Sequence, residues 1–318
     1  MTRLSVADPA TWMRLHHLQT SLPPDRAPAL YEWIHAQHLP TAYERDLAAA
    51  FDKLTRQHLG TNETWLAVSG PSHLGKSTAI TRVLLDRATA HPQPWRTRTK
   101  DGYLHTPCVY VEAGSKQEAR GLLASVARFC ALPDTGSEKE LHQMLGRLLP
   151  AMGVELVVVD DAQMYRRVSD SASRLTDGLR TLLHLPVPFA FVGIDLDRSA
   201  LLRDPGRNND TAQQLRRRHI GLRLNPIRTN DARTVVRLIA SFVARMRAIE
   251  HLHLACLQDP RLQLRLVADL EGRPGSILNT LKRAAVEGLA DNDGIVTADH
   301  VDAEIVAVQS LAAGSVAS

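Results

Sequence analysis

Short apolar runs alternate with longer amphipathic stretches through the middle of the chain. Each run is four to six residues long and rich in branched or aromatic side chains, which is typical of strands buried on both faces. The runs cover residues 65–69, 108–113, 156–159, 189–192 and 220–224. Stretches with helical periodicity cover residues 46–58, 77–88, 117–130, 138–149 and 172–185. This alternation predicts an α/β fold with a parallel five-stranded sheet covered by helices on both faces.

The pattern changes on both sides of this central region. Before it, aromatic and aliphatic positions are interrupted by Leu22-Pro23-Pro24-Asp25, which predicts short helices around a proline turn. After Pro226 the helical stretches 231–248, 262–270 and 276–289 follow one another without a strand. We therefore expect four parts: an N-terminal helical extension (1–48), an αβα domain (49–226), a helical lid domain (227–308) and a flexible tail (309–318).

Composition and charge narrow the class of protein. The 318 residues are 44% hydrophobic and 23% charged, as in folded globular proteins. No apolar run approaches the roughly 18 residues of a membrane-spanning helix, and residues 1–10 lack the layout of a signal peptide, so we expect a cytoplasmic protein. Three separated cysteines without C-x-x-C spacing argue against a disulfide framework or a cysteine zinc site. The net charge of +4 is compatible with nucleic-acid binding without establishing it.

A phosphate-binding motif lies between the first predicted strand and the helix that follows. Gly70-Pro71-Ser72-His73-Leu74-Gly75-Lys76-Ser77 satisfies G-x-x-x-x-G-K-[ST], and Thr78 continues into the helix. The glycines let successive backbone N–H groups point at phosphates, and the start of the helix adds a partial positive charge. Lys76 is expected to reach the β- and γ-phosphates, and Ser77 to bind Mg²⁺. Residues 70–78 therefore predict an ATP site in the αβα domain.

A pair of carboxylates supplies the second part of this site. The apolar run 156–159 ends in Asp160-Asp161. Asp160 is expected to hold Mg²⁺ together with Ser77, and Asp161 stands where a glutamate commonly polarises the attacking water. The side chain of Asp161 is one methylene shorter than that of a glutamate, so we expect slow ATP hydrolysis.

The two motifs and the helical region behind them resemble an AAA+ ATPase, and more narrowly the TniB/TnsC family of transposition regulators. The resemblance covers roughly residues 36–305 and rests on stretches in a common order. They are His38-Leu39-Pro40-Thr41, Val109 to Ala113, Gly153-Val154-Glu155 leading into Asp160-Asp161-Ala162-Gln163, Phe189 to Gly193, Gln214 to His219, Leu224-Asn225-Pro226 and Glu271 to Leu278. Two positions depart from the family: Asp161 replaces a glutamate, and Ile194 replaces a threonine, so the usual polar sensor is missing or is supplied by Asp195.

The resemblance implies an ATP-bound homo-oligomer, a ring or a helical filament, that assembles on duplex DNA. It also implies recruitment of a DDE transposase and of a target-selection protein of the TniQ type, followed by disassembly on hydrolysis. Arg218, with Arg217 second, matches the arginine that a neighbouring subunit brings to the γ-phosphate. Arg273, in the lid, matches a second sensor of the phosphates. For each arginine, a solvated position near a helix end is the alternative interpretation.

The candidates for DNA binding are basic residues in two segments. In initiator-like ATPases the helix after the second strand faces a central pore, and here it carries Lys116 and Arg120. The other segment combines Arg96, Arg98 and Lys100 with an aromatic residue, Trp95, and a basic hairpin on the outer surface is the alternative interpretation. Such residues contact phosphates without sequence preference, as a regulator that accepts many targets requires.

Two other functions use the same ATP site. One is that of another DNA-associated, initiator-like AAA+ ATPase, such as a helicase loader or a motor accessory. The other is a nucleotide switch of the STAND type, whose members often carry Asp-Asp at the position of Asp160 and Asp161. A transposase gene beside the gene for this chain would favour the transposition regulator.

Overall fold

The computed structural model describes most of the chain and divides it into two compact units, which we treat separately. The described residues are 9–61, 64–114, 119–163, 181–196, 217–228, 231–291 and 293–314. The sheet unit consists of Met1–Met13, Ala42–Pro71 and Ser77–Leu224. The helical unit consists of Arg14–Thr41, Ser72–Lys76 and Asn225–Ser318.

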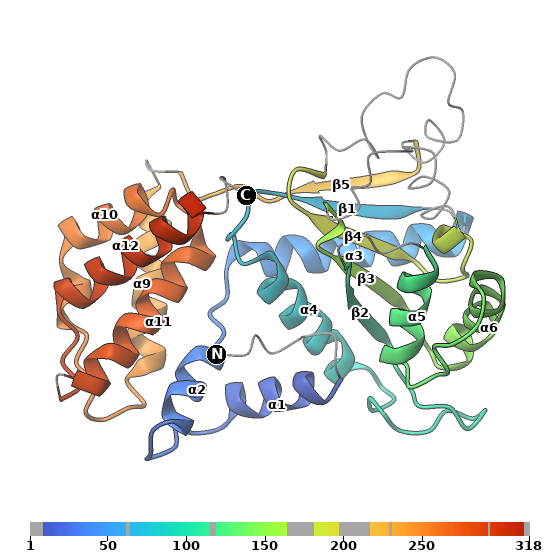
Figure 1. Cartoon of the computed structure of the whole chain (residues 1–318), viewed down its shortest axis with the longest axis horizontal. Coiled ribbons are helices and arrows are strands. Elements are labelled where there is room, and N and C mark those ends of the chain that lie inside the picture. The colour runs from blue at the N-terminus through green and yellow to red at the C-terminus, as the bar shows by residue number, and fades with distance from the viewer. Residues whose placement is uncertain are drawn as a thin grey trace. The chain divides into compact units, whose positions relative to one another are not determined.

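Five parallel strands form the centre of the sheet unit (Figure 1). They are β1 (Trp65–Ser69), β2 (Cys108–Glu112), β3 (Leu156–Asp160), β4 (Phe189–Gly193) and β5 (His219–Arg223). Their order is β2-β3-β4-β1-β5, and every neighbouring pair is parallel. All residues of β1, β3 and β4 are buried, which explains their continuous apolar sequences. The predicted α/β fold and its five-stranded parallel sheet are confirmed.

Helices cover the sheet at the positions that the periodicity predicts. They are α3 (Ala42–Thr61), α4 (Lys76–Ala90), α5 (Ala119–Phe129) and α6 (Glu138–Ala151). The helix α3 packs against β1 and β5, whereas α5 packs against β2 and α6. A capping box between Ser137 and Glu140 begins α6. The predicted helix 172–185 lies for the most part outside the described residues.

The first part of α1 (Pro9–Thr20) belongs to the sheet unit through Trp12. This side chain is fully buried, and its ring centroid lies 5.4 Å from that of Trp95, 5.5 Å from that of Phe129 and 6.3 Å from that of Tyr110. Burial of such large aromatic surfaces is strongly stabilising. Trp12 therefore fixes the start of α1 beside β2, the strand that carries Tyr110.

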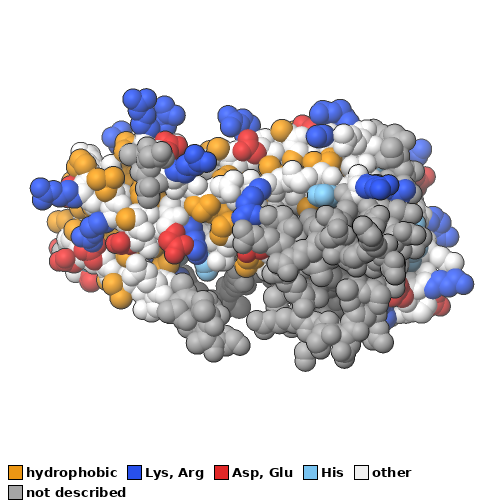
Figure 2. Space-filling model, turned by 90° about the horizontal axis from the view of Figure 1, so that it is seen from above, with side chains coloured by type: hydrophobic (Ala, Val, Ile, Leu, Met, Phe, Trp, Pro, Cys, Tyr) orange, Lys and Arg blue, Asp and Glu red, His pale blue; other side chains and the backbone are white. Residues whose placement is uncertain are grey.

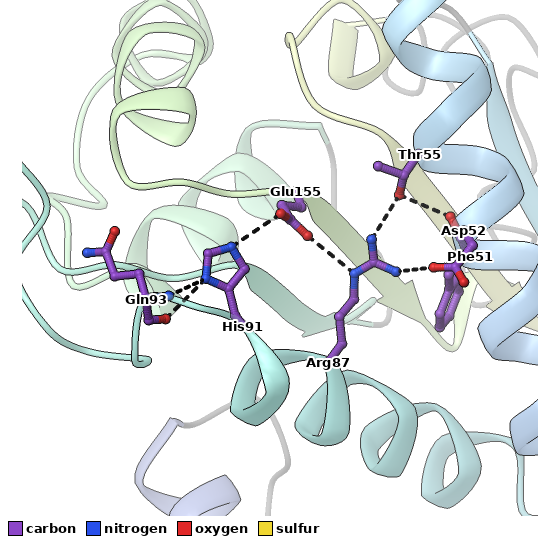
Figure 3. A network of polar contacts seen from close by, with 7 residues as sticks. All are labelled: Phe51, Asp52, Thr55, Arg87, His91, Gln93 and Glu155. Atoms are coloured by element: carbon purple, nitrogen blue, oxygen red, sulfur yellow. Dashed lines mark hydrogen bonds and ion pairs between the residues drawn. The ribbon is translucent and has the colours of Figure 1, made fainter.

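A polar network holds α3 and α4 at the amino edge of the sheet, where the strands begin (Figure 3). Arg87 of α4 pairs with Asp52 of α3 (Nη1 to Oδ1, 2.7 Å) and with Glu155 (Nε to Oε2, 3.4 Å). It also donates to Thr55 Oγ1 at 3.4 Å. Glu155 directly precedes β3, and its Oε1 lies 3.4 Å from His91 Nε2. Each carboxylate in this network thus has a basic neighbour.

The helical unit is built around one apolar core. Its helices are α2 (Ala29–Ala36), α9 (Ala232–Met246), α10 (Pro260–Asp269), α11 (Pro274–Asp291) and α12 (Ala298–Gly314), with a 3-10 turn at Ala255–Gln258. Trp33 and Ile34 of α2 are fully buried in this core beside residues of the C-terminal helices, such as Phe242. The last helix, α12, continues into the residues for which a flexible tail is predicted. None of the described helices is long and apolar enough to cross a membrane.

Candidate nucleotide-binding site

The predicted phosphate loop connects the end of β1 to the first turn of α4, as the motif requires. Gly75 has a φ of 86°, in the left-handed region that favours glycine, and His73 has a φ of 60°. Alternation of right- and left-handed residues turns successive backbone N–H groups toward one side, which creates an anion-binding concavity. Leu74 is buried and anchors the loop, and Lys76, also largely buried, is the first residue of α4. The backbone conformation therefore suits the binding of phosphates.

Within the helical unit, the start of α11 supports residues 72–76 of this loop. The Ser276 N–H donates a hydrogen bond to the His73 carbonyl oxygen at 3.2 Å. At Gly275, a Cβ atom would lie 2.6 Å from both Gly75 N and His73 O. Because these neighbours are backbone atoms, any larger residue at position 275 would displace the loop or the helix. Gly275 belongs to a stretch that carries the family resemblance, but the sequence of that stretch alone does not show what Gly275 does.

Arg273, the candidate second sensor, lies in the turn before α11. Its guanidinium forms an ion pair with Glu271. Glu271 has a φ of 52° and Gly272 a φ of 62°, so the turn is tight. The role of Arg273 at the phosphates stays a prediction.

In the sheet unit, Asp160 at the end of β3 is 2% exposed and is held by two hydrogen bonds. Its Oδ1 accepts from the Asp161 N–H at 2.8 Å, and its Oδ2 accepts from the Tyr110 hydroxyl at 2.7 Å. Burial, followed by the negative charge of Asp160, raises the pKa of Tyr110 well above its usual value. The phenol therefore stays protonated and orients Asp160, one of the two predicted Mg²⁺ ligands.

The chemistry of these side chains fits Mg²⁺. A hydroxyl and a carboxylate are the hard oxygen ligands that this ion prefers, and nucleotide phosphates and water complete its octahedron. Each Asp160 oxygen accepts one of the described hydrogen bonds and so keeps a lone pair for a ligand. Ser77 and Asp160 would hold the ion, which would supply neutralisation of the phosphate charge.

Asp161 has a neighbour that the sequence motifs do not identify. Its backbone is left-handed, with a φ of 53°, and its Oδ1 accepts a hydrogen bond from Gln163 Nε2 at 3.1 Å. Gln163 Oε1 in turn accepts from the Ile194 N–H, directly after β4, at 3.0 Å. Ile194 thus contributes its backbone to the site although its side chain is apolar. The next residue, Asp195, has its Oδ1 3.9 Å from Arg223 Nη2.

Sequence reasoning missed Tyr110 and Gln163 as parts of this site. A signal for Tyr110 was present, because a tyrosine within a buried strand needs a partner for its hydroxyl. A weaker signal for Gln163 was its position two residues after the pair of carboxylates. Which groups they contact depends on strand neighbours that are distant in sequence.

The candidate arginine fingers lie at the opposite edge of the sheet from Asp160. Arg217 and Arg218 are exposed and directly precede β5, and the Arg218 carbonyl oxygen accepts from the Trp65 N–H at 3.2 Å. Because β5 is parallel to β1, these residues belong to the amino edge, whereas Asp160 ends its strand at the carboxyl edge. A five-residue strand spans about 15 Å. This placement suits an arginine that serves the site of a neighbouring subunit.

The candidate DNA-binding residues differ in their surroundings. Lys116 lies outside the described residues. Arg120 is exposed on α5 and donates from Nε to the Gly136 carbonyl oxygen at 2.8 Å. Arg98 and Lys100 are exposed on a hairpin-like loop, whereas Arg96 is half-buried. Lys and Arg side chains are prominent on the face in Figure 2, interspersed with hydrophobic and acidic ones.

Comparisons with known proteins agree with this fold. Residues 58–195 match the family model of an AAA domain. No curated protein matches the sequence significantly. The fold is similar to that of Aeropyrum pernix ORC2 with ADPNP and ADP, with a TM-score of 0.57, 16% identity, and coverage of 91% of this chain and 71% of that chain. Aeropyrum pernix ORC1 in complex with DNA gives a TM-score of 0.55 and 19% identity over 85% of this chain and 66% of that chain.

One conclusion about architecture follows from the strand order, the loop between β1 and α4, the C-terminal helical region and these similarities. The chain has an α/β fold of the AAA+ P-loop NTPase type, and residues 58–195 match the model of an AAA domain.

Proposed function

We propose that this protein is an ATP-dependent, DNA-binding AAA+ regulator of transposition that hydrolyses ATP slowly. The observation that carries the proposal is the phosphate loop, in which Gly75 takes the left-handed conformation directly before Lys76 and the start of α4. Backbone N–H groups, a helix N-terminus and a lysine together favour a polyphosphate.

Hydrolysis is assigned to the carboxyl edge of the sheet. Ser77 and Asp160 would hold Mg²⁺, which would neutralise phosphate charge, and Asp161 orients and polarises the attacking water. Water must approach in line with the bond that breaks, and a shorter carboxylate reaches it less well than a glutamate does. Slow turnover suits a regulator whose ATP-bound form must persist while its partners assemble.

The positions of the candidate arginine fingers support self-association. Arg217 and Arg218 precede β5 at the amino edge, so the γ-phosphate that they would stabilise belongs to another copy of the chain. A trans arginine makes the bound nucleotide part of the interface between subunits. We therefore assign the protein a homo-oligomeric, ATP-bound state in the form of a ring or a helical filament.

The DNA-binding and transposition roles have separate support. ORC1, whose fold is similar, was solved in complex with DNA, and this chain offers exposed cations at Arg98, Lys100 and Arg120. The choice of transposition rests on the TniB/TnsC-like stretches of the sequence. In this assignment the assembled protein recruits a DDE transposase and a TniQ-type partner to the target DNA. A helicase loader or similar ATPase is the alternative, and it would recruit a helicase instead.

The test measures binding of a fluorescent duplex by anisotropy without nucleotide, with ADP and with a non-hydrolysable ATP analogue, over a range of salt concentrations. We expect tight binding and oligomers only with the analogue, because assembly aligns the cations of many subunits along one DNA backbone. Each neutralised phosphate contributes about 0.9 to the logarithmic salt slope. Equal affinity in all three nucleotide states would contradict the proposal.

Two sets of variants separate assembly from DNA contact in this assay. Arg218→Ala should weaken oligomer formation and DNA binding together. Removing the charges of Lys116 and Arg120 should weaken DNA binding and flatten the salt slope while ATP affinity stays unchanged. Lys53→Ala, at an exposed lysine of α3, is the matched control and should leave oligomer formation, DNA binding, the salt slope and ATP affinity unchanged.

A further inference from the structure

Gln163 joins the ends of two neighbouring strands through its side-chain amide. Strands β3 and β4 pair in register, with Val159 opposite Phe191. Asp161 follows β3 and Ile194 follows β4. The Gln163 side chain lies between them, since its Nε2 donates to Asp161 Oδ1 at 3.1 Å and its Oε1 accepts from the Ile194 N–H at 3.0 Å.

Each end of the amide has a partner of the matching kind. The NH₂ group can only donate and the carbonyl oxygen can only accept, so a carboxylate at one end and a backbone N–H at the other fix the orientation of the side chain. A hydrogen bond to an ionised carboxylate is also stronger than one between neutral groups. Gln163 is therefore held at both ends, and it holds Asp161 in turn.

Gly193 leaves the space that this arrangement needs. A Cβ atom at position 193 would lie 2.5 Å from Gln163 Oε1 and 3.0 Å from two atoms of Leu196. The φ of Gly193 is not positive, so its backbone conformation does not require a glycine. Because Gly193 has no side chain, there is room for the Gln163 amide against the end of β4.

We propose that Gln163 is a positioning residue for Asp161, fixing the carboxylate that polarises the attacking water and coupling its place to the end of β4. This role rests on the proposed ATPase function. Ile194 has an apolar side chain, and the Gln163 amide connects its backbone N–H to Asp161. A misplacement of about 1 Å at a reacting group can cost roughly 100-fold in rate. Precise placement matters more for Asp161, because its side chain is short.

The first experiment measures kcat, KM and nucleotide affinity for Gln163→Ala and Gln163→Glu. We expect Gln163→Ala to lower kcat by roughly tenfold with KM and nucleotide affinity unchanged, because the residue acts on the placement of Asp161 and not on the phosphates. Gln163→Glu should lower kcat further, since a second carboxylate replaces the donor at nearly the same volume. Gln143→Ala, at an exposed glutamine of α6, is the matched control.

Two double-mutant cycles distinguish positioning from a structural role. In single-turnover assays, Gln163→Ala should cause no further loss once Asp161 is replaced by alanine, because nothing remains to be positioned. Gly193→Ala should lower kcat in the otherwise unchanged protein and much less in the Gln163→Ala background, where its main clash is removed. A melting temperature close to that of the unchanged protein would show that the folded state persists.

The outcomes separate this role from the proposed function. If the unchanged protein neither binds nor hydrolyses ATP, the proposed function and this role both fail. If it hydrolyses ATP and Gln163→Ala retains full kcat, only the positioning role is overturned. The role is overturned as well if Gln163→Ala causes the same loss with and without the Asp161 carboxylate.

Discussion

Asp160 and Asp161, at the carboxyl edge of the parallel sheet, have partners of a different kind from those of the carboxylates at its amino edge. At the amino edge, Asp52 and Glu155 are paired with Arg87, and Glu155 also faces His91 (Figure 3). At the carboxyl edge, Asp160 and Asp161 are held by the neutral donors described above, which are a phenol, a backbone amide and a glutamine amide. Neutral donors orient a carboxylate and leave its negative charge uncompensated. Asp160 and Asp161 therefore suit the proposed roles of holding a cation and acting on water, whereas Asp52 and Glu155 fasten helices to the sheet.

The largest expected effect comes from Lys76→Ala, in the phosphate loop. The loop backbone remains, but the lysine charge on the β- and γ-phosphates is lost, so ATP affinity should fall by roughly 100-fold or more. Titration calorimetry with ATP would measure this loss, with a circular-dichroism melt to confirm the fold. Unchanged affinity would remove the phosphate-loop assignment.

Asp160→Ala should abolish the Mg²⁺-dependent part of ATP turnover, because the ion loses its protein carboxylate. Asp52→Ala, which removes a carboxylate of the amino edge, is the matched comparison for Asp160→Ala. Asp52→Ala should retain turnover and lose only stability. A Mg²⁺ titration of phosphate release would show both results, and equal turnover in the two variants would contradict the contrast.

Tyr110→Phe keeps the buried ring and removes only the hydroxyl that orients Asp160. Outer-sphere partners of metal ligands are commonly worth 10–100-fold in affinity, so the Mg²⁺ concentration for half-maximal ATP turnover should rise roughly tenfold. ATP turnover measured against Mg²⁺ concentration gives this value. Tyr103→Phe, at a tyrosine of the hairpin-like loop, provides the control and should leave the Mg²⁺ requirement unchanged. An unchanged requirement in Tyr110→Phe would mean that the hydroxyl has no role at the metal site.

Arg87→Met should act on stability alone. The methylenes keep their packing, but the pairs with Asp52 and Glu155 and the bond to Thr55 are lost. Because these groups are partly solvated, we expect a loss of about 1–2 kcal/mol in the free energy of unfolding. Arg82→Met, which removes an exposed pair with Asp86 on the same helix, should cost less than about 0.5 kcal/mol. Urea unfolding measures both losses. A loss of ATP affinity in Arg87→Met would contradict the interpretation that the amino-edge network affects stability alone.

The smallest expected effect is a pH dependence at the amino edge. Burial, the largest cause, lowers the pKa of His105, whose ring lies 4.5 Å from that of His91. Between the lowered value and the ordinary 6.5 the unfolded chain binds more protons, so the free energy of unfolding rises with pH in that window. Replacing His105 with glutamine should make urea unfolding at pH 5.5 and 7.5 more alike. His17→Gln, at an exposed histidine, should not do so.

Local features of the sequence determined the strands, the phosphate loop and the carboxylate pair. Strand periodicity and the spacing around Gly75 and Lys76 are encoded within a few residues, because backbone conformation and short-range periodicity suffice to specify them. The sequence placed Asp160 at the end of a buried strand for the same reason. The start of α4 fell within one residue of its predicted position.

Only the tertiary structure decided what surrounds these groups. Tyr110 reaches Asp160 because β2 pairs with β3, with Glu112 opposite Asp160. Gln163 reaches the Ile194 backbone because β3 neighbours β4, and the space for its amide depends on Gly193. Likewise, Trp33 of the N-terminal region enters the core of the helical unit beside Phe242. Such contacts join residues that are far apart in the chain, so which groups meet is set by strand order and helix packing.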